Sequence, residues 1–144
     1  MDQKEILSKV DHTLLTPTAT WEQVRAVCEQ GKEFCTASVC IPPRFVKKAA
    51  EYLGNDLKIC TVVGFPNGYS TPEVKVFETE DAIRNGADEI DMVINLGLAK
   101  AGDWEGVLEE IKAVKFSCKG RILKVIVGAC LLTQEAKVAA CRVV

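Results

Sequence analysis

The sequence predicts an α/β protein built from parallel βα units, and two observations carry that prediction. Apolar, strand-length segments alternate with amphipathic, helix-length segments along the whole chain, and this alternation is typical of α/β folds. The strand segments are apolar on both faces, as in KICTVVGF (58–65), which suits parallel strands that are covered by helices. Two architectures fit this pattern, an open doubly wound sheet and a (β/α)₈ barrel.

The missing nucleotide motifs weaken one of these architectures, and the length limits the other to about five-eighths of a barrel. The chain contains neither a G-x-G-x-x-G fingerprint nor a Walker A sequence, which weakens the nucleotide-binding version of the open sheet. A complete barrel takes about 250 residues, and this chain has 144. We therefore expect residues 1–144 to form a single, partial barrel domain of about five strands, truncated after the fifth unit.

Capping and breaking residues define the elements of the first half. The expected order is a helix over 2–8, a strand over 10–13, a helix over 20–33, a strand over 36–41, a helix over 43–54 and a strand over 58–65. Thr20 and Gln23 give a capping-box signal at the start of the second helix. Pro42 and Pro43 stop the second strand, and Gly54 ends the helix that follows it.

The second half continues in the same way. The expected order is a helix over 71–87, a strand over 89–95, a helix over 103–118, a strand over 122–130 and a helix over 133–144. Pro72 fits the first turn of the first of these helices, and Asp103 is the expected N-cap of the next. With the first half, these segments give five βα units.

Composition and charge exclude several classes of function. The net charge is −2, so the chain has no polyanion-binding signature and we expect no nucleic-acid partner. No apolar run approaches the roughly 20 residues of a membrane span. The start, MDQKEILSKV, lacks the basic region and apolar core of a signal peptide. We therefore expect a cytoplasmic protein without a membrane partner.

The seven cysteines are expected to be reduced thiols of the core. They stand at positions 28, 35, 40, 60, 118, 130 and 141. None forms a C-x-x-C pair, and the single histidine gives little help to a zinc site. Most lie in apolar segments, where a free thiol behaves as a small hydrophobe. We expect no metal and no disulfide.

A lysine inside an apolar strand is the first candidate for chemistry. Lys124 interrupts the strand 122–130, and Asp91 interrupts the strand 89–95. If the two strands are neighbours, the carboxylate and the ammonium can meet on the concave side of the sheet. Such pairing would relieve the cost of burying each charge. The spacing leaves two interpretations open, a structural ion pair and a catalytic pair.

Further candidates lie at other strand ends, where barrel sites form. Asp11 ends the first short strand and is followed by Thr13; it could also cap a turn through its own backbone. His12 shows no partner and is interpreted as a neutral, packed or exposed side chain. Cys40 ends the second strand as a core thiol or a site residue. The loop 64–70 could form part of a substrate mouth, although turn geometry explains its glycines and asparagine equally well.

Five motifs together resemble consecutive motifs of deoxyribose-phosphate aldolase. They are KVDHTLL, ASVCIPPRFV, TVVGFPNG, NGADEIDMVINLG and LKVIVGACLLT. The resemblance implies a (β/α)₈ barrel and a class I aldolase. Such an enzyme joins acetaldehyde to glyceraldehyde 3-phosphate, or cleaves 2-deoxy-D-ribose 5-phosphate, through a lysine Schiff base and without a metal or cofactor.

The resemblance also implies roles for individual residues. Asp91 matches the family's proton-relay aspartate, and Lys124 matches a lysine of the active site. Asp11, Thr13 and Cys40 match family positions near the substrate, which would be a small phosphorylated sugar or aldehyde. Proton transfer at the acetaldehyde carbon needs a relay, and Asp91 with a water could supply it.

Two departures from the family pattern bear on activity. The family's Schiff-base lysine lies in a later segment of the type VKTSTG, and no such segment occurs in residues 1–144; the second catalytic lysine and the phosphate loops are likewise absent. Gly128 stands where the family commonly has a glutamate. We do not expect Lys124 to replace the nucleophile, because a neighbouring carboxylate favours its charged form. The chain alone is expected to be inactive or very weakly active.

Two other functions compete with an impaired aldolase. The fifth strand of a partial barrel would present an open edge, which is a template for pairing. The chain could therefore be a non-catalytic fragment that self-associates into a homo-oligomer through that edge. A nucleotide- or phosphate-binding α/β domain is the weakest alternative, because no glycine-rich phosphate loop follows a strand.

Overall fold

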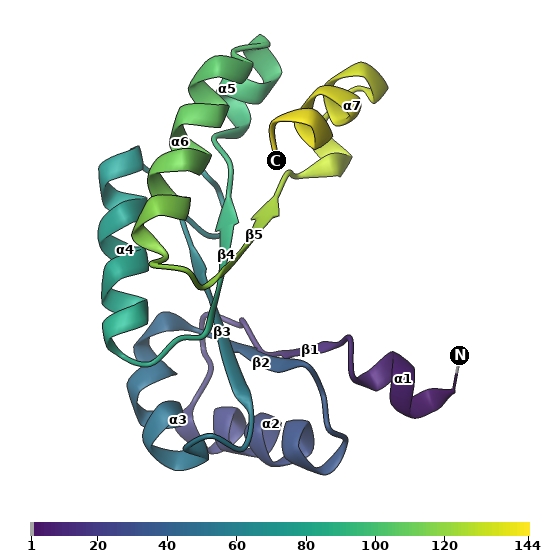
Figure 1. Cartoon of the computed structure of the whole chain (residues 1–144), viewed down its shortest axis with the longest axis vertical. Helices are drawn as coiled ribbons and strands as arrows, with labels where there is room; N and C mark the ends of the chain where they lie inside the picture. Colours follow the sequence, from purple (N-terminus) through teal and green to yellow (C-terminus); the bar gives the residue numbers. More distant parts are fainter. Residues whose placement is uncertain (1) are drawn as a thin grey trace. The chain divides into compact units, whose positions relative to one another are not determined.

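The computed structural model describes residues 2–144 and has the predicted α/β architecture (Figure 1). The strands are β1 (Asp11–Thr13), β2 (Ser38–Ile41), β3 (Lys58–Val63), β4 (Glu89–Val93) and β5 (Ile122–Ile126). They belong to one sheet with the order β1-β2-β3-β4-β5. The helices are α1 (Gln3–Leu7), α2 (Trp21–Glu33), α3 (Val46–Leu53), α4 (Pro72–Arg84), α5 (Leu96–Ala101), α6 (Trp104–Ser117) and α7 (Gln134–Val143). Two 3₁₀ turns, η1 (Pro43–Phe45) and η2 (Ala129–Leu131), complete the fold.

The chain divides into two compact units, which are described separately. The first comprises residues up to 62 together with 82–89, and the second comprises 63–81 together with 90–144. In the first unit, β1 and β3 each pair in parallel with β2, and the register sets Cys40 opposite Thr13 on one side and opposite Cys60 on the other. All four residues of β2 are buried, as expected for a strand with neighbours on both sides.

Helices α2 and α3 pack together in the first unit beside β1 and β2 (Figure 1). Val24 and Cys28 of α2 and Ala49 of α3 are fully buried, which is the apolar stripe expected at helical spacing. The predicted capping box is confirmed: Thr20 N donates to Gln23 Oε1 at 3.0 Å, and Gln23 N donates to Thr20 Oγ1 at 3.4 Å. These bonds satisfy two backbone donors at the helix start.

In the second unit, β4 is more deeply buried than β5. Ile90, Met92 and Val93 are at most 2% exposed, whereas every residue of β5 is partly or fully accessible. Just beyond the end of β4, Ile94 N donates to Ile126 O of β5 at 3.2 Å. Helices α5, α6 and α7 contact one another in this unit. The predicted N-cap of α6 is confirmed, because Asp103 accepts a bond from Gly106 N at 2.9 Å.

Two predicted strand ends were wrong, and backbone chemistry explains why. The strand expected over 89–95 ends at Val93, because Asn95 instead caps the unpredicted helix α5 by accepting from Leu98 N at 3.1 Å. The strand expected over 122–130 ends at Ile126. Gly128 there adopts a left-handed conformation with φ of 61°, which a strand cannot accommodate. A Cβ at this glycine would lie 2.6 Å from Leu96 Cδ2.

The prediction of core cysteines was correct for four of the seven. Cys28, Cys40, Cys60 and Cys118 are buried, while the remaining three, at positions 35, 130 and 141, are exposed. The apolar segments that contain these three are a helix end, a 3₁₀ turn and a terminal helix, which turn part of their surface to solvent. Within residues 2–144, no helix has the length and apolar character needed to span a membrane.

Candidate functional site

The structure brings Asp91 and Lys124 together, as strand alternation predicted. Lys124 Nζ lies 3.1 Å from Asp91 Oδ1, and the two side chains are 34% and 17% exposed respectively. Asp91 lies on the opposite face of β4 from Ile90 and Met92, which are 0% exposed, because side chains alternate along a strand. The predicted contact is confirmed, and the pair forms a partly accessible charged centre on adjacent strands.

One oxygen of this centre keeps its hydrogen-bonding capacity. Asp91 Oδ1 is buried, and among residues 2–144 it receives no hydrogen bond of adequate geometry, although the Lys124 ammonium lies within ion-pair distance. Buried polar atoms are seldom left in this state, and each instance needs an explanation. A carboxylate oxygen that is held near a cation but accepts no bond is suited to accept a proton or a hydrogen bond from a bound molecule.

The other predicted site residues lie in the first unit. Ser38 Oγ donates to Asp11 Oδ1 at 2.7 Å, so the Asp11 carboxylate joins β1 to β2. Thr13 Oγ1 donates to the Asp11 carbonyl at 2.7 Å. Cys40 is 2% exposed and packs with Cys60 and other apolar neighbours, as expected of a core thiol. The prediction that Asp11 ends its strand was wrong, because the paired segment continues to Thr13 and Asp11 is the first residue of β1.

The histidine beside Asp11 has a partner that the sequence did not reveal. His12 Nε2 lies 2.8 Å from Gln30 Oε1 of α2. This bond attaches the ring to the neighbouring helix and gives it a structural role. The interpretation of His12 as a packed or exposed side chain agrees with this arrangement.

Sequence reasoning missed a second lysine–carboxylate pair. Lys75 Nζ lies 2.6 Å from Glu110 Oε1, and the side chains are 0% and 1% exposed. One signal for it was present: Glu110 falls at helical spacing among Val107, Ile111 and Val114, which are all buried. A charged residue on the apolar stripe of a helix needs a buried partner. The partner could not be identified from spacing, because Lys75 lies on a different helix.

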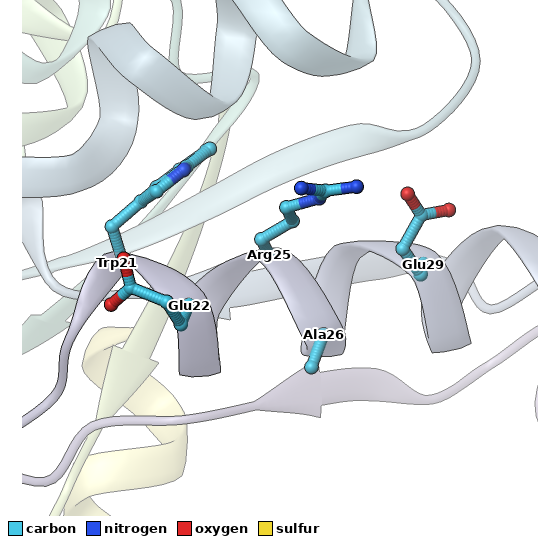
Figure 2. Close-up of a pocket in the computed structure, with 5 residues that line it drawn as sticks. All are labelled: Trp21, Glu22, Arg25, Ala26 and Glu29. Carbon is cyan, nitrogen blue, oxygen red and sulfur yellow. The ribbon is translucent and has the colours of Figure 1, made fainter.

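A surface pocket along α2 offers no comparable chemistry (Figure 2). Its lining residues are Trp21, Glu22, Arg25, Ala26 and Glu29, all from one helix. Figure 2 shows the Arg25 and Glu29 side chains projecting from the same side of that helix. The Trp21 ring packs below Lys48 Nζ, 4.4 Å from the ring centre, which accounts for its position by a cation–π contact.

Parallel strands joined through helices define the class of α/β proteins that are built from βα units. Within that class, the family model described as DeoC/LacD family aldolase matches residues 1–141. The chain belongs to this family of aldolases.

Curated relatives and solved structures agree with the family. The chain is 57% identical over 144 residues to a deoxyribose-phosphate aldolase of Streptococcus pyogenes, covering 100% of this chain and 65% of the relative. It is 56% identical to that of Streptococcus agalactiae with the same coverage. The chain thus spans 65% of the length of these curated relatives.

Two solved structures show the fold. One, described as a candidate deoxyribose-phosphate aldolase from Coccidioides immitis, superposes with a TM-score of 0.95 at 35% identity, covering 99% of this chain and 57% of that one. A deoxyribose phosphate aldolase from Aeropyrum pernix, described as a tetramer, superposes with a TM-score of 0.83 at 29% identity, covering 99% and 60%. The predicted barrel-type α/β fold is confirmed, and the open doubly wound alternative is set aside.

Proposed function

We propose that residues 1–144 form a partial barrel domain that supplies the first five βα units of a cytoplasmic deoxyribose-phosphate aldolase. Its reaction would be the reversible cleavage of 2-deoxy-D-ribose 5-phosphate to acetaldehyde and glyceraldehyde 3-phosphate. The observation that carries the proposal is the Asp91–Lys124 pair, 3.1 Å apart, with a buried Asp91 oxygen that accepts no hydrogen bond. The family match over residues 1–141 supports it.

The chemistry of this pair follows from its geometry. Cleavage of the carbon–carbon bond leaves electrons on the carbon that becomes the acetaldehyde methyl group, and that carbon must gain a proton. In the reverse direction a base must remove the same proton. Asp91 Oδ1 would serve as that base, directly or through a water, and general acid–base groups contribute about 100- to 10,000-fold to such steps.

We further propose that Asp11, Thr13 and Cys40 contribute to the substrate side of the site. Asp11 is fixed by its bond from Ser38 at 2.7 Å, and Cys40 lies in register with Thr13 on the neighbouring strand. Thr13 is the last residue of β1 and Cys40 is next to the last residue of β2, and barrel enzymes bind their substrates at the C-terminal ends of the strands. A small phosphorylated sugar with several hydroxyl groups suits a rim of carboxylate and hydroxyl side chains.

A polypeptide of residues 1–144 alone would be inactive or very weakly active in this scheme. An iminium intermediate requires a neutral lysine as the nucleophile. Lys124 is an ammonium beside a carboxylate, and Lys75 is fully enclosed with a carboxylate partner. Neither is presented as a free amine to an aldehyde.

A chimeric enzyme tests the aldolase proposal. Residues 1–144 would replace the matched segment of the Streptococcus pyogenes relative, and cleavage of 2-deoxyribose 5-phosphate would be followed by the release of acetaldehyde. We expect the chimera to be active and Asp91→Asn in it to lower turnover by about 100- to 10,000-fold. A folded but inactive chimera, or an Asp91→Asn chimera with full turnover, would contradict the proposal.

Borohydride trapping tests the inactivity of the chain alone. The chain would be incubated with 2-deoxyribose 5-phosphate or acetaldehyde, reduced with sodium borohydride and weighed as an intact protein. We expect no substrate-dependent adduct. A single adduct that maps to Lys124 and disappears in Lys124→Met would show that this lysine is a working nucleophile.

One observation favours the alternative of a self-associating, non-catalytic fragment. Ile122 at the start of β5 is 47% exposed, and no residue of β5 is fully buried. A second copy of the chain would be the partner that covers this strand. Analytical ultracentrifugation across a range of concentrations should then show dimers or larger species, whereas a monomer with native-like circular dichroism would exclude this alternative.

A further inference from the structure

The buried pair of Lys75 and Glu110 makes more bonds than neutralising two charges requires. Lys75 Nζ donates to Gly68 O at 2.7 Å, to Val93 O at 2.8 Å and to Glu110 Oε1 at 2.6 Å. An ammonium has three donors, and here each has an acceptor. The lysine therefore joins three segments of the second unit: the loop after β3, the end of β4 and helix α6.

Glu110 extends the same network to the residue that starts α5. Its Oε2 accepts a bond from Asn95 N at 2.9 Å, while Oε1 faces Lys75. The backbone after β4 is thus held at two points, through the carbonyl of Val93 and the amide of Asn95. Replacement of a buried ion pair by apolar side chains is often neutral or stabilising. Stability alone consequently gives little reason for a pair here.

The loop that follows β3 packs closely against the backbone that follows β4. A Cβ at Gly68 would lie 2.0 Å from the carbonyl oxygen of Ile94, and a Cβ at Gly64 would lie 2.6 Å from Lys75 Cε. Both glycines have positive φ values, 73° and 60°. The loop can approach this closely only because side chains are missing at these two positions.

The backbone segment 93–95, which Lys75 and Glu110 hold, lies next to the candidate site. Val93 is two residues beyond Asp91 on β4. Ile94 N donates to Ile126 O at 3.2 Å, and Ile126 is two residues beyond Lys124 on β5. The segment 93–95 therefore adds a hydrogen bond between the two neighbouring strands just beyond the charged pair. A shift of this segment would displace the strand ends that carry Asp91 and Lys124.

We propose that Lys75 and Glu110 are positioning residues that set the separation of Asp91 and Lys124. The catalytic meaning of this proposal rests on the aldolase function proposed above, but the geometric effect does not. If Lys75 and Glu110 had only a structural role, their substitution would change stability. The candidate site would then be unchanged in every variant that folds.

The test uses a variant in which both charges are removed together. Lys75→Met/Glu110→Leu keeps apolar volume and leaves no buried charge, so its urea unfolding midpoint should stay close to that of the parent chain. Amide hydrogen exchange at Asn95 should become about tenfold faster or more, because its bond to a charged group is lost. Exchange at Ile94, which donates to Ile126 O, should also become faster, because the network no longer holds the adjacent backbone. Reductive methylation of Lys124, measured by mass spectrometry relative to the exposed Lys112, should become about two- to fivefold faster.

Two further variants make the outcome decisive. Glu110→Gln preserves shape and keeps an oxygen acceptor for Lys75, although it removes the counter-charge and should be less stable than the parent. It is the second variant in which the network is weakened, and it should change the same two readouts in the same direction. Val107→Ala, a cavity in the same helix at a residue with 0% exposure, is the control that lowers stability without touching the network. Parental exchange at Ile94 and parental methylation of Lys124 in a folded network variant would overturn the proposal.

The readouts also separate this proposal from the proposed function. None of them requires turnover, so an inactive chimera would refute the aldolase function and leave the positioning role intact. An active chimera whose turnover is unchanged by Lys75→Met/Glu110→Leu would refute the positioning role and leave the aldolase function intact.

Discussion

The second unit contains two lysine–carboxylate pairs that differ in their exposure and in the number of their hydrogen-bond partners. Lys75 and Glu110 are at most 1% exposed, lie 2.6 Å apart, and their charged atoms reach backbone groups on several segments. Asp91 and Lys124 are 17% and 34% exposed and lie 3.1 Å apart, and one carboxylate oxygen accepts no hydrogen bond. The first pair is saturated with partners and the second is not.

The difference shows how to separate a structural pair from a candidate catalytic one. A buried pair must satisfy every donor and acceptor, because each unsatisfied group is costly. A pair that is to exchange protons must keep capacity for another molecule and must be accessible to it. Both pairs consist of a lysine and a carboxylate with the same charges, so hydrogen-bond saturation and exposure are the features that separate them.

The largest expected effect is the loss of one partner of the saturated pair. Lys75→Met leaves the Glu110 carboxylate buried without its cation, which should lower the free energy of unfolding by about 3–5 kcal/mol. Urea denaturation followed by circular dichroism measures this. A loss below about 1 kcal/mol, the value of an exposed pair, would mean that the Lys75–Glu110 pair is not saturated in solution.

Substitution of Gly68, which packs against the backbone beside that pair, should give the next largest loss in the free energy of unfolding. Gly68→Ala combines a left-handed backbone with a Cβ placed 2.0 Å from Ile94 O and should cost about 2–5 kcal/mol. Gly54→Ala is the matched control, because its φ is 56° but no atom lies within 4 Å of the new Cβ; it should cost about 1–2 kcal/mol. Equal losses in thermal unfolding would show that the loop does not press on the strand end.

The buried thiol of Cys28 and the exposed thiol of Cys35 allow the same comparison through their reactivity. Burial raises the pKa of the Cys28 thiol to about 11, with a smaller contribution from Glu29, whereas Cys35 is exposed. At pH 8.5, iodoacetamide should modify Cys28 about 100-fold more slowly than Cys35, since the thiolate is the reactive form. Peptide mass spectrometry of time points measures both rates, and similar rates would contradict the burial of Cys28.

The sign of the associated stability change follows from the raised pKa. The folded state binds the Cys28 proton more tightly than the unfolded chain, whose thiol keeps a value near 9.0. The contribution of this thiol to stability is therefore complete below about pH 9 and is lost as the pH rises through about 11. In Cys28→Ala this pH dependence should disappear from the unfolding midpoint.

The smallest expected effects separate the candidate site from an ordinary surface pair. Lys124→Met should change the free energy of unfolding by about 1 kcal/mol or less, because the pair is partly exposed. Lys112→Ala removes a pair with Glu109 in which both side chains are more than half exposed, and it should cost about 0.5 kcal/mol or less. A loss of several kcal/mol for Lys124→Met in urea denaturation would make the Asp91–Lys124 pair structural.

Local patterns in the sequence were sufficient for the fold class and for one of the two pairs. Alternating strand and helix segments predicted the α/β architecture, and the period of two along a strand placed Asp91 and Lys124 on faces that could meet. Thr20 and Asp103 marked helix starts through capping, which depends only on residues three positions away. These are the features that short-range geometry determines.

Features that depend on tertiary contacts could not be predicted in the same way. Glu110 stood on an apolar helix stripe, but its partner Lys75 lies 35 residues away in the sequence, and no local period joins them. Helix α5 was missed because its N-cap, Asn95, was assigned to the end of the strand predicted over 89–95. Gly128 was placed in a strand because its left-handed conformation is a property of the turn, not of the apolar run.

The close approach of Gly128 to Leu96 couples the side chains that these two positions can hold. Any side chain at 128 must share space with Leu96 Cδ2, which would lie 2.6 Å from its Cβ, and must also accept a φ of 61°. A glutamate at 128 would therefore need a smaller or reoriented residue at 96 and a rebuilt turn after β5. Substitutions at the two positions are expected to be acceptable together and harmful separately.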